Sequence, residues 1–285
     1  MNSKLTKTIV VTGANKGIGY GIVKGLLKSG KSQDARIILT SRNVDLGKKT
    51  FNELREKCSV YNVEERLVYQ QLDINDTKSQ EEFCTWLAKT YGTITTLVNN
   101  AGVSINSDQF DTEVFDITFS TNFFETVNFT ERVLKANLVT EKIIFVSSSI
   151  TRWVELAKSK KDQFENPNIT SEEIIQLAND FRRAIETKTW KESGWPESCY
   201  GMSKVCLSFY TRYLAKRKDV VDRNIQVYSC CPGWVQTDMG GKNASRTLDE
   251  GVVCPIFLVE LEGNKISQEL QGNFFYDSQV VSIFQ

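Results

Sequence analysis

The chain contains no histidine among its 285 residues. This absence excludes imidazole as a general base and excludes a zinc site with histidine ligands, so we expect no metal site. Net charge is absent as well, because 35 lysines and arginines balance 35 aspartates and glutamates. Without an excess of positive charge, the chain has no global field that would draw it to nucleic acid or to an anionic membrane. Function must therefore depend on local groups.

Long apolar runs and a disulfide framework are also missing. No stretch approaches the ~18 consecutive apolar residues of a membrane-spanning helix, and residues 1–7 lack the apolar region of a signal peptide. Seven cysteines occur without a repeating spacing, and the adjacent Cys230 and Cys231 cannot easily bridge to each other. Such usage is typical of a reducing compartment. We therefore expect a cytoplasmic protein in which Cys230 and Cys231 are inert and buried, with redox-sensitive thiols as the alternative.

Short β-rich runs alternate with amphipathic segments along most of the chain. The runs that predict strands cover residues 8–11, 36–40, 67–72, 96–98, 143–146, 226–229 and 272–276. The segments that predict helices cover residues 19–28, 46–58, 79–91, 114–136, 199–218 and 248–260. This alternation requires right-handed crossovers and a parallel sheet with helices on both faces. With no repeat or linker, the sequence predicts one α/β domain over residues 1–285, built on a doubly wound sheet of seven parallel strands.

One stretch of about fifty residues before Tyr200 interrupts the alternation and is far longer than a usual connection between a strand and a helix. Residues 152–195 are largely charged and polar, yet Thr170-Ser171-Glu172-Glu173 resembles a helix start. Apolar residues then follow at helical spacing, at positions 174, 175, 177, 178, 181 and 185. The sequence therefore predicts a helical insertion that lies over the domain, with a disordered loop as the alternative.

A glycine-rich turn joins the first predicted strand to the first predicted helix, with the sequence Gly13-Ala14-Asn15-Lys16-Gly17-Ile18-Gly19. Gly13 permits a tight turn, Gly17 lets the backbone approach a pyrophosphate, and Gly19 allows the helix to pack closely on the strand. Because helix N-termini attract phosphates, this context predicts a dinucleotide site in a Rossmann-type sheet. A glycine-rich turn that binds nothing is the alternative.

A tyrosine and a lysine four residues apart form a candidate acid. In Tyr200-Gly201-Met202-Ser203-Lys204, helical spacing places the phenol and the ammonium on one face. A nearby positive charge favours the phenolate, so we expect the Tyr200 pKa to fall below its usual ~10. Such a phenol can protonate an alkoxide near neutral pH. The same spacing recurs at Tyr20 and Lys24, where we expect a structural pair, and an exposed helix pair is the alternative for Tyr200.

Several motifs in a fixed order together resemble the short-chain dehydrogenase/reductase family. They are Thr12-Gly13-x3-Gly17-x-Gly19, Asn99-Asn100-Ala101-Gly102, a serine after the fifth strand, Tyr200-x3-Lys204 and Pro232-Gly233. The resemblance spans essentially the whole chain. Within the family, Gly194-Trp195-Pro196, residues 230–239 and the insertion are most similar to the monomeric NADPH-dependent carbonyl reductases of animals. Plant menthone and salutaridine reductases share the insertion. Most members associate through the helix that carries the tyrosine and lysine, which the insertion is expected to cover, so we predict a monomer.

The resemblance implies catalytic roles for four residues. Ser148, rather than the serine on either side of it, would hold the substrate carbonyl, and Tyr200 would donate a proton to the carbonyl oxygen. Lys204 would lower the tyrosine pKa and bind the nicotinamide ribose. Asn122 matches the helix asparagine that supports a water relay to the lysine, with a local backbone hydrogen bond as the alternative. The implied reaction is hydride transfer from NADPH to the carbonyl of a small molecule: an aldehyde, a ketone or a quinone.

The cofactor choice follows from charge at the end of the second strand. An acidic residue there would bind the ribose 2′-hydroxyl of NAD, but this chain has Arg42. Arg42 can pair bidentately with a 2′-phosphate and Lys16 can add charge, so NADP(H) is expected over NAD(H). The glycine turn and the resemblance together imply further cofactor contacts at Gly13, Asn15, Gly17, Ile18, Gly19, Asp73, Ile74, Asn100, Ala101, Gly102, Tyr200, Lys204, Pro232, Gly233, Val235 and Thr237.

The substrate site is expected to be apolar. Trp153, Trp195, Trp234 and Met239 are predicted to line it, although large aromatic side chains more often pack in a core. Residues 105–107 differ from the aromatic and basic pattern of the glutathione-binding loop in the resembled reductases, which argues against glutathione conjugates as substrates. Three alternatives stay open: an ene-reductase, a terpenoid or alkaloid ketone reductase with the same insertion, and a non-catalytic NADPH-binding sensor.

Overall fold

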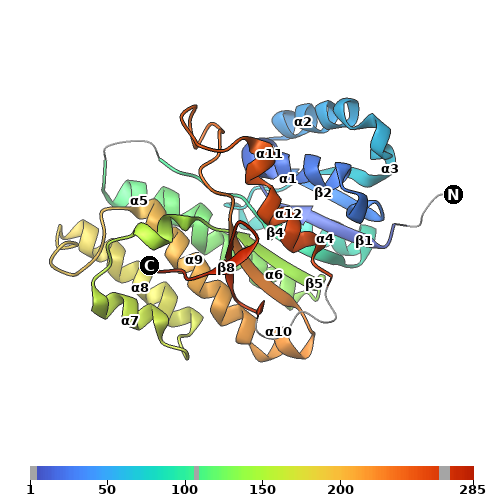
Figure 1. Ribbon diagram of the computed structural model, residues 1–285. Coiled ribbons are helices and arrows are strands. Elements are labelled where there is room, and N and C mark those ends of the chain that lie inside the picture. Colours follow the sequence, from blue (N-terminus) through green and yellow to red (C-terminus); the bar gives the residue numbers. More distant parts are fainter. Residues whose placement is uncertain (1–4, 106–108, 263–269) are drawn as a thin grey trace.

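The structure is a computed structural model that describes residues 5–105, 109–262 and 270–285. Figure 1 shows a twisted sheet flanked by helices. Its strands are β1 Lys7–Val11, β2 Ala35–Ser41, β3 Leu67–Gln71, β4 Ile94–Asn99, β5 Val139–Val146, β6 Gln226–Cys231, β7 Phe274–Tyr276 and β8 Gln279–Val281. The order across the sheet is β3-β2-β1-β4-β5-β6-β7-β8. The order reverses between β1 and β4, and sheets of this kind have a ligand crevice at that point.

The prediction of parallel strands is correct for β1 to β7, but the number of seven is wrong. β8 pairs antiparallel with β7, with Phe274 opposite Val281. The hairpin turns at Asp277 and Ser278, whose φ angles of 51° and 61° are those of a tight two-residue turn. A strand of three residues carries too little alternation to be recognised in a sequence. The added strand matters for the site, because Asp277 binds a loop that borders the cleft.

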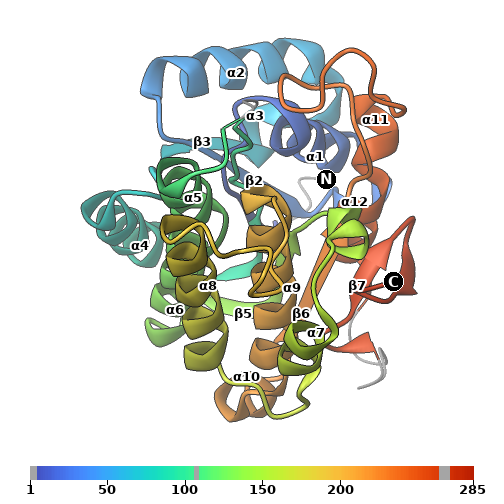
Figure 2. The same cartoon turned by 90° about the vertical axis from the view of Figure 1, so that its left-hand side faces the viewer.

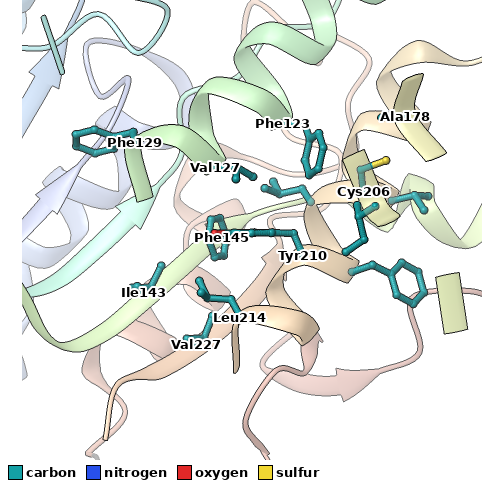
Figure 3. Packing of buried hydrophobic residues seen from close by; sticks show 14 of the residues in the cluster. Phe123, Val127, Phe129, Ile143, Phe145, Ala178, Cys206, Tyr210, Leu214 and Val227 are labelled. Carbon is teal, nitrogen blue, oxygen red and sulfur yellow. The ribbon is translucent and has the colours of Figure 1, made fainter. Parts of the chain in front are cut away.

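Helices pack on both faces of the sheet, as the alternation predicts. They are α1 Gly17–Lys28, α2 Val44–Lys57, α3 Val63–Arg66, α4 Thr77–Tyr91, α5 Thr112–Phe119, α6 Glu125–Lys135, α7 Lys158–Glu165, α8 Ser171–Glu186, α9 Cys199–Lys216, α10 Lys218–Asp222, α11 Leu248–Gly251 and α12 Val253–Glu260. Buried residues of α1, α2 and α12 form one cluster, and those of α4, α5, α6, α8 and α9 form another. Figure 3 shows the second cluster, where Phe145 of β5 meets Tyr210 of α9 with ring centres 5.8 Å apart. No helix among the described residues is long and apolar enough to cross a membrane.

The helix predicted over residues 114–136 is divided by a wider, π-helical turn, Ser120–Phe124 (η3). The Thr126 hydroxyl, just after this turn in α6, donates to the Thr121 carbonyl within it at 2.8 Å. Turns of this kind often occur at functional sites, because they rotate side chains away from the regular helical faces. Here the turn carries Asn122, which is buried.

The insertion is helical, which confirms the prediction and excludes a disordered loop for its described part. α8 begins at a reciprocal cap, in which the Thr170 hydroxyl accepts from the Glu173 amide at 3.2 Å and the Glu173 carboxylate accepts from the Thr170 amide at 2.8 Å. The preceding helix α7 has no side-chain cap and was not predicted. The ring centre of buried Phe181 of α8 lies 5.9 Å from that of Phe115 of α5. α8 also packs along α9. Figure 2 shows α8 and α7 on either side of α9.

Candidate active site

A cleft of about 730 Å³ lies at the carboxyl ends of the central strands. Its walls are the glycine turn, the loops after β2 to β6 and the start of α9. The predicted residues that line it are Gly13, Asn15, Lys16, Gly17, Ile18, Arg42, Asp73, Ile74, Asn100, Ala101, Gly102, Ser148, Trp153, Tyr200, Lys204, Pro232, Gly233, Trp234, Val235, Thr237 and Met239. The fold therefore gathers motifs that are spread over more than two hundred residues of sequence at the switch in strand order.

The glycine turn is held by the Asn-Ala-Gly segment after β4. Asn100 Nδ2 donates to the carbonyls of Thr12 and Gly13, at 2.8 and 3.2 Å. Gly13 has a φ of +61°, and a Cβ there would lie 2.9 Å from the Ala101 Cα. A Cβ on Gly19 would lie 2.5 Å from Asn100 Nδ2. The close approach of two backbones thus requires glycine at both positions, and Gly19 acts in packing rather than as part of the cleft wall.

The start of α9 brings the tyrosine and lysine to the cleft. Lys204 Nζ donates to the Val146 carbonyl at the end of β5, at 3.0 Å, and lies 5.7 Å from the centre of the Tyr200 ring. Ser148 lines the same cleft, close enough to the Tyr200 phenol to lower its pKa. Two residues from one helix and one from the loop after β5 therefore meet, as the motifs predict.

Ser148 is the member of the serine triplet whose environment suits a substrate contact. Ser147 is buried, and its hydroxyl hydrogen-bonds two groups of α9, the Ser208 hydroxyl at 2.8 Å and the Lys204 carbonyl at 3.2 Å. Ser149 opens the 3₁₀ turn Ser149–Trp153 (η4), which the Ser148 side chain caps. Alternation along an extended strand end places neighbouring side chains on opposite sides. The geometry therefore favours Ser148 over Ser147.

Burial governs the proton affinities of the pair, and the predicted direction for Tyr200 is wrong. Desolvation raises the pKa of Tyr200 to about 12, and the nearby Ser148 side chain offsets this only in part. Desolvation also lowers the pKa of Lys204 to about 8. The Lys204 ammonium is held by the Val146 carbonyl. Its positive charge, which would lower the Tyr200 pKa, does not outweigh the loss of water around the phenol, which raises it. Tyr200 is therefore protonated at neutral pH, as a proton donor must be.

Asn122 joins the π-helical turn to the segment after β4. Its Oδ1 accepts from the Val103 amide at 2.7 Å, and its Nδ2 donates to the Val103 carbonyl at 2.9 Å and to the Ser203 hydroxyl at 3.1 Å. Val103 is 19 residues away, so the alternative of a local backbone bond is wrong. A Cβ on Gly102 would lie 3.2 Å from Asn122 Oδ1 and 3.6 Å from Lys204 Nζ. Asn122 thus lies beside the lysine and fixes its surroundings.

The two predicted phosphate-binding cations differ in their partners. Lys16 pairs with Asp238 of the loop after β6, with Nζ and Oδ2 2.8 Å apart, and both side chains are exposed. Arg42 follows β2 and lines the cleft. Within the described part of the chain it has no ion-pair partner. The guanidinium is therefore available to an anion, whereas the Lys16 ammonium is shared with a carboxylate.

Comparison with known proteins identifies the family. The sequence profile of the short chain dehydrogenases matches residues 7–157. The chain belongs to that family. NADPH carbonyl reductase 1 of Sus scrofa is 32% identical over 286 residues, which cover 98% of this chain and 95% of that protein. NADPH carbonyl reductase 3 of Homo sapiens is 32% identical over 287 residues, with 98% and 99% covered. The structure of salutaridine reductase from Papaver somniferum matches with a TM-score of 0.79 and 26% identity, over 95% of this chain and 99% of that one.

The aromatic residues of this short-chain dehydrogenase divide between cleft and core. Trp153, Trp234 and Met239 are exposed and line the cleft. The prediction for Trp195 is wrong, because its side chain is 4% exposed and its ring lies 5.5 Å from that of Phe181. This indole therefore packs against a helix of the insertion itself. Ile105 is described and exposed, whereas residues 106 and 107 of the loop predicted to disfavour glutathione conjugates lie outside the described residues.

Two further expectations about side chains outside the cleft can be compared with the structure. The Tyr20 hydroxyl donates to Glu53 of α2 at 2.9 Å and Lys24 pairs with Asp249, so both side chains have structural roles as predicted, but with separate partners. Cys230 and Cys231 are free and buried at the end of β6, as predicted for inert thiols. The Cys231 sulfur accepts from the Gly233 amide at 3.1 Å.

Arg246 was not predicted, and it holds the loop after β6. Its guanidinium binds both carboxylate oxygens of Asp277 in the β7–β8 turn, at 2.5 and 2.9 Å. Its backbone pairs with the loop, since the Arg246 amide donates to the Trp234 carbonyl at 3.0 Å and the Gln236 amide donates to the Arg246 carbonyl at 2.9 Å. The contact between Arg246 and Asp277 joins residues 31 positions apart in sequence, and no local pattern signals such a pairing.

Proposed function

We propose that this protein is an NADPH-dependent carbonyl reductase, which transfers a hydride from NADPH to the carbonyl carbon of an aldehyde, a ketone or a quinone. One observation carries the proposal: Ser148, Tyr200 and Lys204 meet in a cleft whose other end is the glycine turn. The curated relatives named as NADPH carbonyl reductases, which match 98% of the chain, support the same reaction.

The cleft fits a nicotinamide dinucleotide phosphate, which supplies the hydride when it is bound. No side chain covers the backbone at Gly13 and Gly17. Their φ angles of +61° and +57° are unfavourable for residues with a side chain. α1 begins at Gly17, and the free amides at a helix start attract phosphate. The residues that would hold the cofactor are Gly13, Asn15, Lys16, Gly17, Ile18, Arg42, Asp73, Ile74, Asn100, Ala101, Gly102, Tyr200, Lys204, Pro232, Gly233, Val235 and Thr237.

The side chains of the chain itself handle the carbonyl oxygen and its proton. Ser148 donates a hydrogen bond to the oxygen, and the Tyr200 phenol, protonated at neutral pH, donates the proton as negative charge develops there. Lys204, held by the Val146 carbonyl, provides positive charge beside the phenol and binds the nicotinamide ribose. Asn122 positions the segment next to Lys204. These groups thus stabilise the negative charge that develops on the carbonyl oxygen during reduction.

A screen of NADPH oxidation tests the proposal. The substrates are quinones, aromatic aldehydes, isatin-like diketones and monoterpene ketones, with alcohol products identified by mass spectrometry. Turnover that produces the alcohol supports the proposal. Purified protein that binds NADPH but oxidises it with none of these classes would instead support the alternative of a non-catalytic sensor.

Two enzymatic alternatives give different products in the same screen. An ene-reductase would saturate the C=C bond of an enone and leave its carbonyl, but Tyr200 is placed as an acid for oxygen. A terpenoid or alkaloid ketone reductase would show turnover confined to those ketones. The structural likeness to salutaridine reductase favours this second alternative among the two.

The preference for NADPH is predicted to depend on Arg42. Loss of charge-assisted hydrogen bonds to the 2′-phosphate costs about 1.5–3 kcal/mol, so Arg42→Ala should raise the KM for NADPH by roughly 10- to 150-fold. The KM for NADH, which lacks this phosphate, should change little. Steady-state kinetics with both cofactors measure the effect, and Arg42→Lys, which keeps the charge without the planar fork, should give an intermediate value. An equal rise for both cofactors would remove Arg42 from the phosphate site.

The assembly state is predicted to be a monomer. The apolar face of α8, with Ile174, Ala178 and Phe181 buried, covers α5 and α9, and α9 carries the surface through which most of the family associate. Light scattering at micromolar concentration should therefore give the mass of one chain, 32.4 kDa. Phe181→Glu should expose the covered face and cause association, whereas Asn179→Glu on the exposed side of α8 should not. A wild-type dimer would contradict the prediction.

The domain organisation and location are part of the same proposal. One domain over residues 1–285 is supported by the two hydrophobic clusters, which cover opposite faces of a single sheet. A cytoplasmic location is supported by the seven cysteines, which are free and buried. Fractionation of cells that express the tagged protein tests the location.

A further inference from the structure

The mouth of the cleft exposes an unusual amount of apolar surface. Ile150, Trp153, Trp234 and Met239 line it, with exposed fractions of 36%, 70%, 57% and 42%. Trp153 is the most exposed tryptophan among the described residues. Apolar surface gathered at one concave site marks a place where a ligand excludes water.

Trp153 extends from a turn that is fixed by its neighbours. It ends the 3₁₀ turn that Ser148 caps, where the Thr151 hydroxyl donates to the Ser148 carbonyl at 3.2 Å. The next residue, Val154, is buried, and its Cγ2 would lie 2.8 Å from a Cβ on Gly201 at the start of α9. The backbone of Trp153 is therefore held between Ser148 and α9, so little order is lost when its indole binds a ligand.

The second indole of the cleft is oriented in a similar way. Trp234 Nε1 donates to the Gly240 carbonyl at 2.8 Å, which satisfies the only polar atom of the side chain. Among the described residues, neither Trp153 nor Trp234 is in ring contact with another aromatic side chain or lies under a cation. Their faces are therefore available for stacking on a flat group.

Charged groups that could hold an anionic substrate are absent from this part of the described cleft. Its charged lining residues are Lys16, Arg42, Asp73, Lys204 and Asp238. Lys16 and Asp238 neutralise each other, and the Lys204 ammonium is buried against the Val146 carbonyl. Arg42 and Asp73 follow β2 and β3, on the opposite side of β1 from the loops after β5 and β6 that carry the indoles. A carboxylate beside the indoles would lose its water without gaining a partner.

We propose that Trp153 determines substrate specificity, by stacking on a flat, uncharged aromatic carbonyl compound whose oxygen is held by Ser148 and Tyr200. The inference rests on the proposed carbonyl reduction. It adds the class of substrate and a residue outside the catalytic set that selects it. Because the turn that presents Trp153 is capped by Ser148, the stacked ring and the bound oxygen are held by one short segment.

The test compares three aldehydes of similar size: 2-naphthaldehyde, its saturated decahydro analogue and 6-carboxy-2-naphthaldehyde. In Trp153→Ala, kcat/KM for 2-naphthaldehyde should fall about tenfold more than kcat/KM for the saturated aldehyde, mainly through KM, because only the flat ring loses a stacking partner. Trp153→Phe, which keeps a ring, should restore most of the difference. Wild-type protein should use the carboxylated aldehyde at least tenfold less well than 2-naphthaldehyde.

The control is Trp86→Phe, which removes an indole on α4 outside the cleft and should leave the ratio between the aldehydes unchanged. Equal losses on flat and saturated aldehydes in Trp153→Ala would overturn the stacking role, and efficient use of the carboxylated aldehyde would overturn the preference for uncharged substrates. Either result leaves carbonyl reduction itself intact. Absence of NADPH oxidation with all three aldehydes and with the wider screen would refute the proposed function and the inference with it.

Discussion

Replacing Tyr200 by phenylalanine is expected to lower kcat for carbonyl reduction by roughly 10²-fold or more, which is the contribution of a positioned general acid. The substitution removes one hydroxyl and keeps the ring, so the packing at the start of α9 is preserved. The pKa of about 12 means that this hydroxyl carries its proton throughout the neutral range. Steady-state turnover gives the loss in rate, and fluorescence titration with NADPH should show that the cofactor still binds.

The chain offers a matched control for this substitution in Tyr20→Phe. Tyr20 also precedes a lysine by four residues, but its hydroxyl binds Glu53 of α2 outside the cleft. Its loss should leave kcat near that of the wild type. If Tyr200→Phe retains full turnover on every active substrate, Tyr200 is not the acid. If both variants lose activity alike, the effect comes from the fold.

Replacing Arg66 by methionine is expected to lower the free energy of unfolding by about 3 kcal/mol or more, because each buried carbonyl left without a donor costs about 1–3 kcal/mol. The Arg66 side chain is 2% exposed. Its guanidinium donates to the carbonyls of Leu26, Leu27, Ser32, Ala35 and Tyr61, at 2.8–3.1 Å. Methionine fills the space but leaves these acceptors without donors, and an unsatisfied buried polar group costs the full loss of its hydration. Urea denaturation followed by circular dichroism measures the change.

Two variants separate this role from a general effect of arginine. Arg66→Lys keeps the charge but has three donors where the site has five acceptors, so its midpoint should fall between those of the methionine variant and the wild type. Arg55→Met breaks an exposed ion pair with Glu64 and should leave the midpoint nearly unchanged. A wild-type midpoint for Arg66→Met would show that water satisfies the five carbonyls.

The features that the sequence predicted correctly are those specified by short-range patterns. The glycine turn of residues 13–19 lies between a strand and a helix because φ preference and hydrophobic periodicity act over a few residues. α8 begins where predicted, because the Thr170–Glu173 cap is complete within four residues. The parallel order of β1 to β7 follows from alternation with helices and from the handedness of crossovers.

The features that the sequence did not predict depend on contacts between distant segments. No local pattern separated Trp195 from Trp153 as core and cleft residues, and Trp195 is a core residue because it packs on Phe181 of α8. The predicted direction of the Tyr200 pKa shift was wrong, because helical spacing indicates that a lysine is near but not that the phenol loses its contact with water. The ion pair of Lys16 with Asp238 joins residues 222 positions apart.

The sequence by itself determined the order of the elements, the cofactor turn, the helical insertion and the residue types available for catalysis. Tertiary structure alone decided which tryptophans line the cleft, how Arg246 and Asp277 hold the loop after β6, and where Arg66 finds its acceptors. The physical reason is the sequence distance over which each kind of interaction acts. Backbone preferences and periodicity act over a few residues, whereas desolvation and hydrogen bonding of buried groups depend on every segment that the fold brings within a few ångströms.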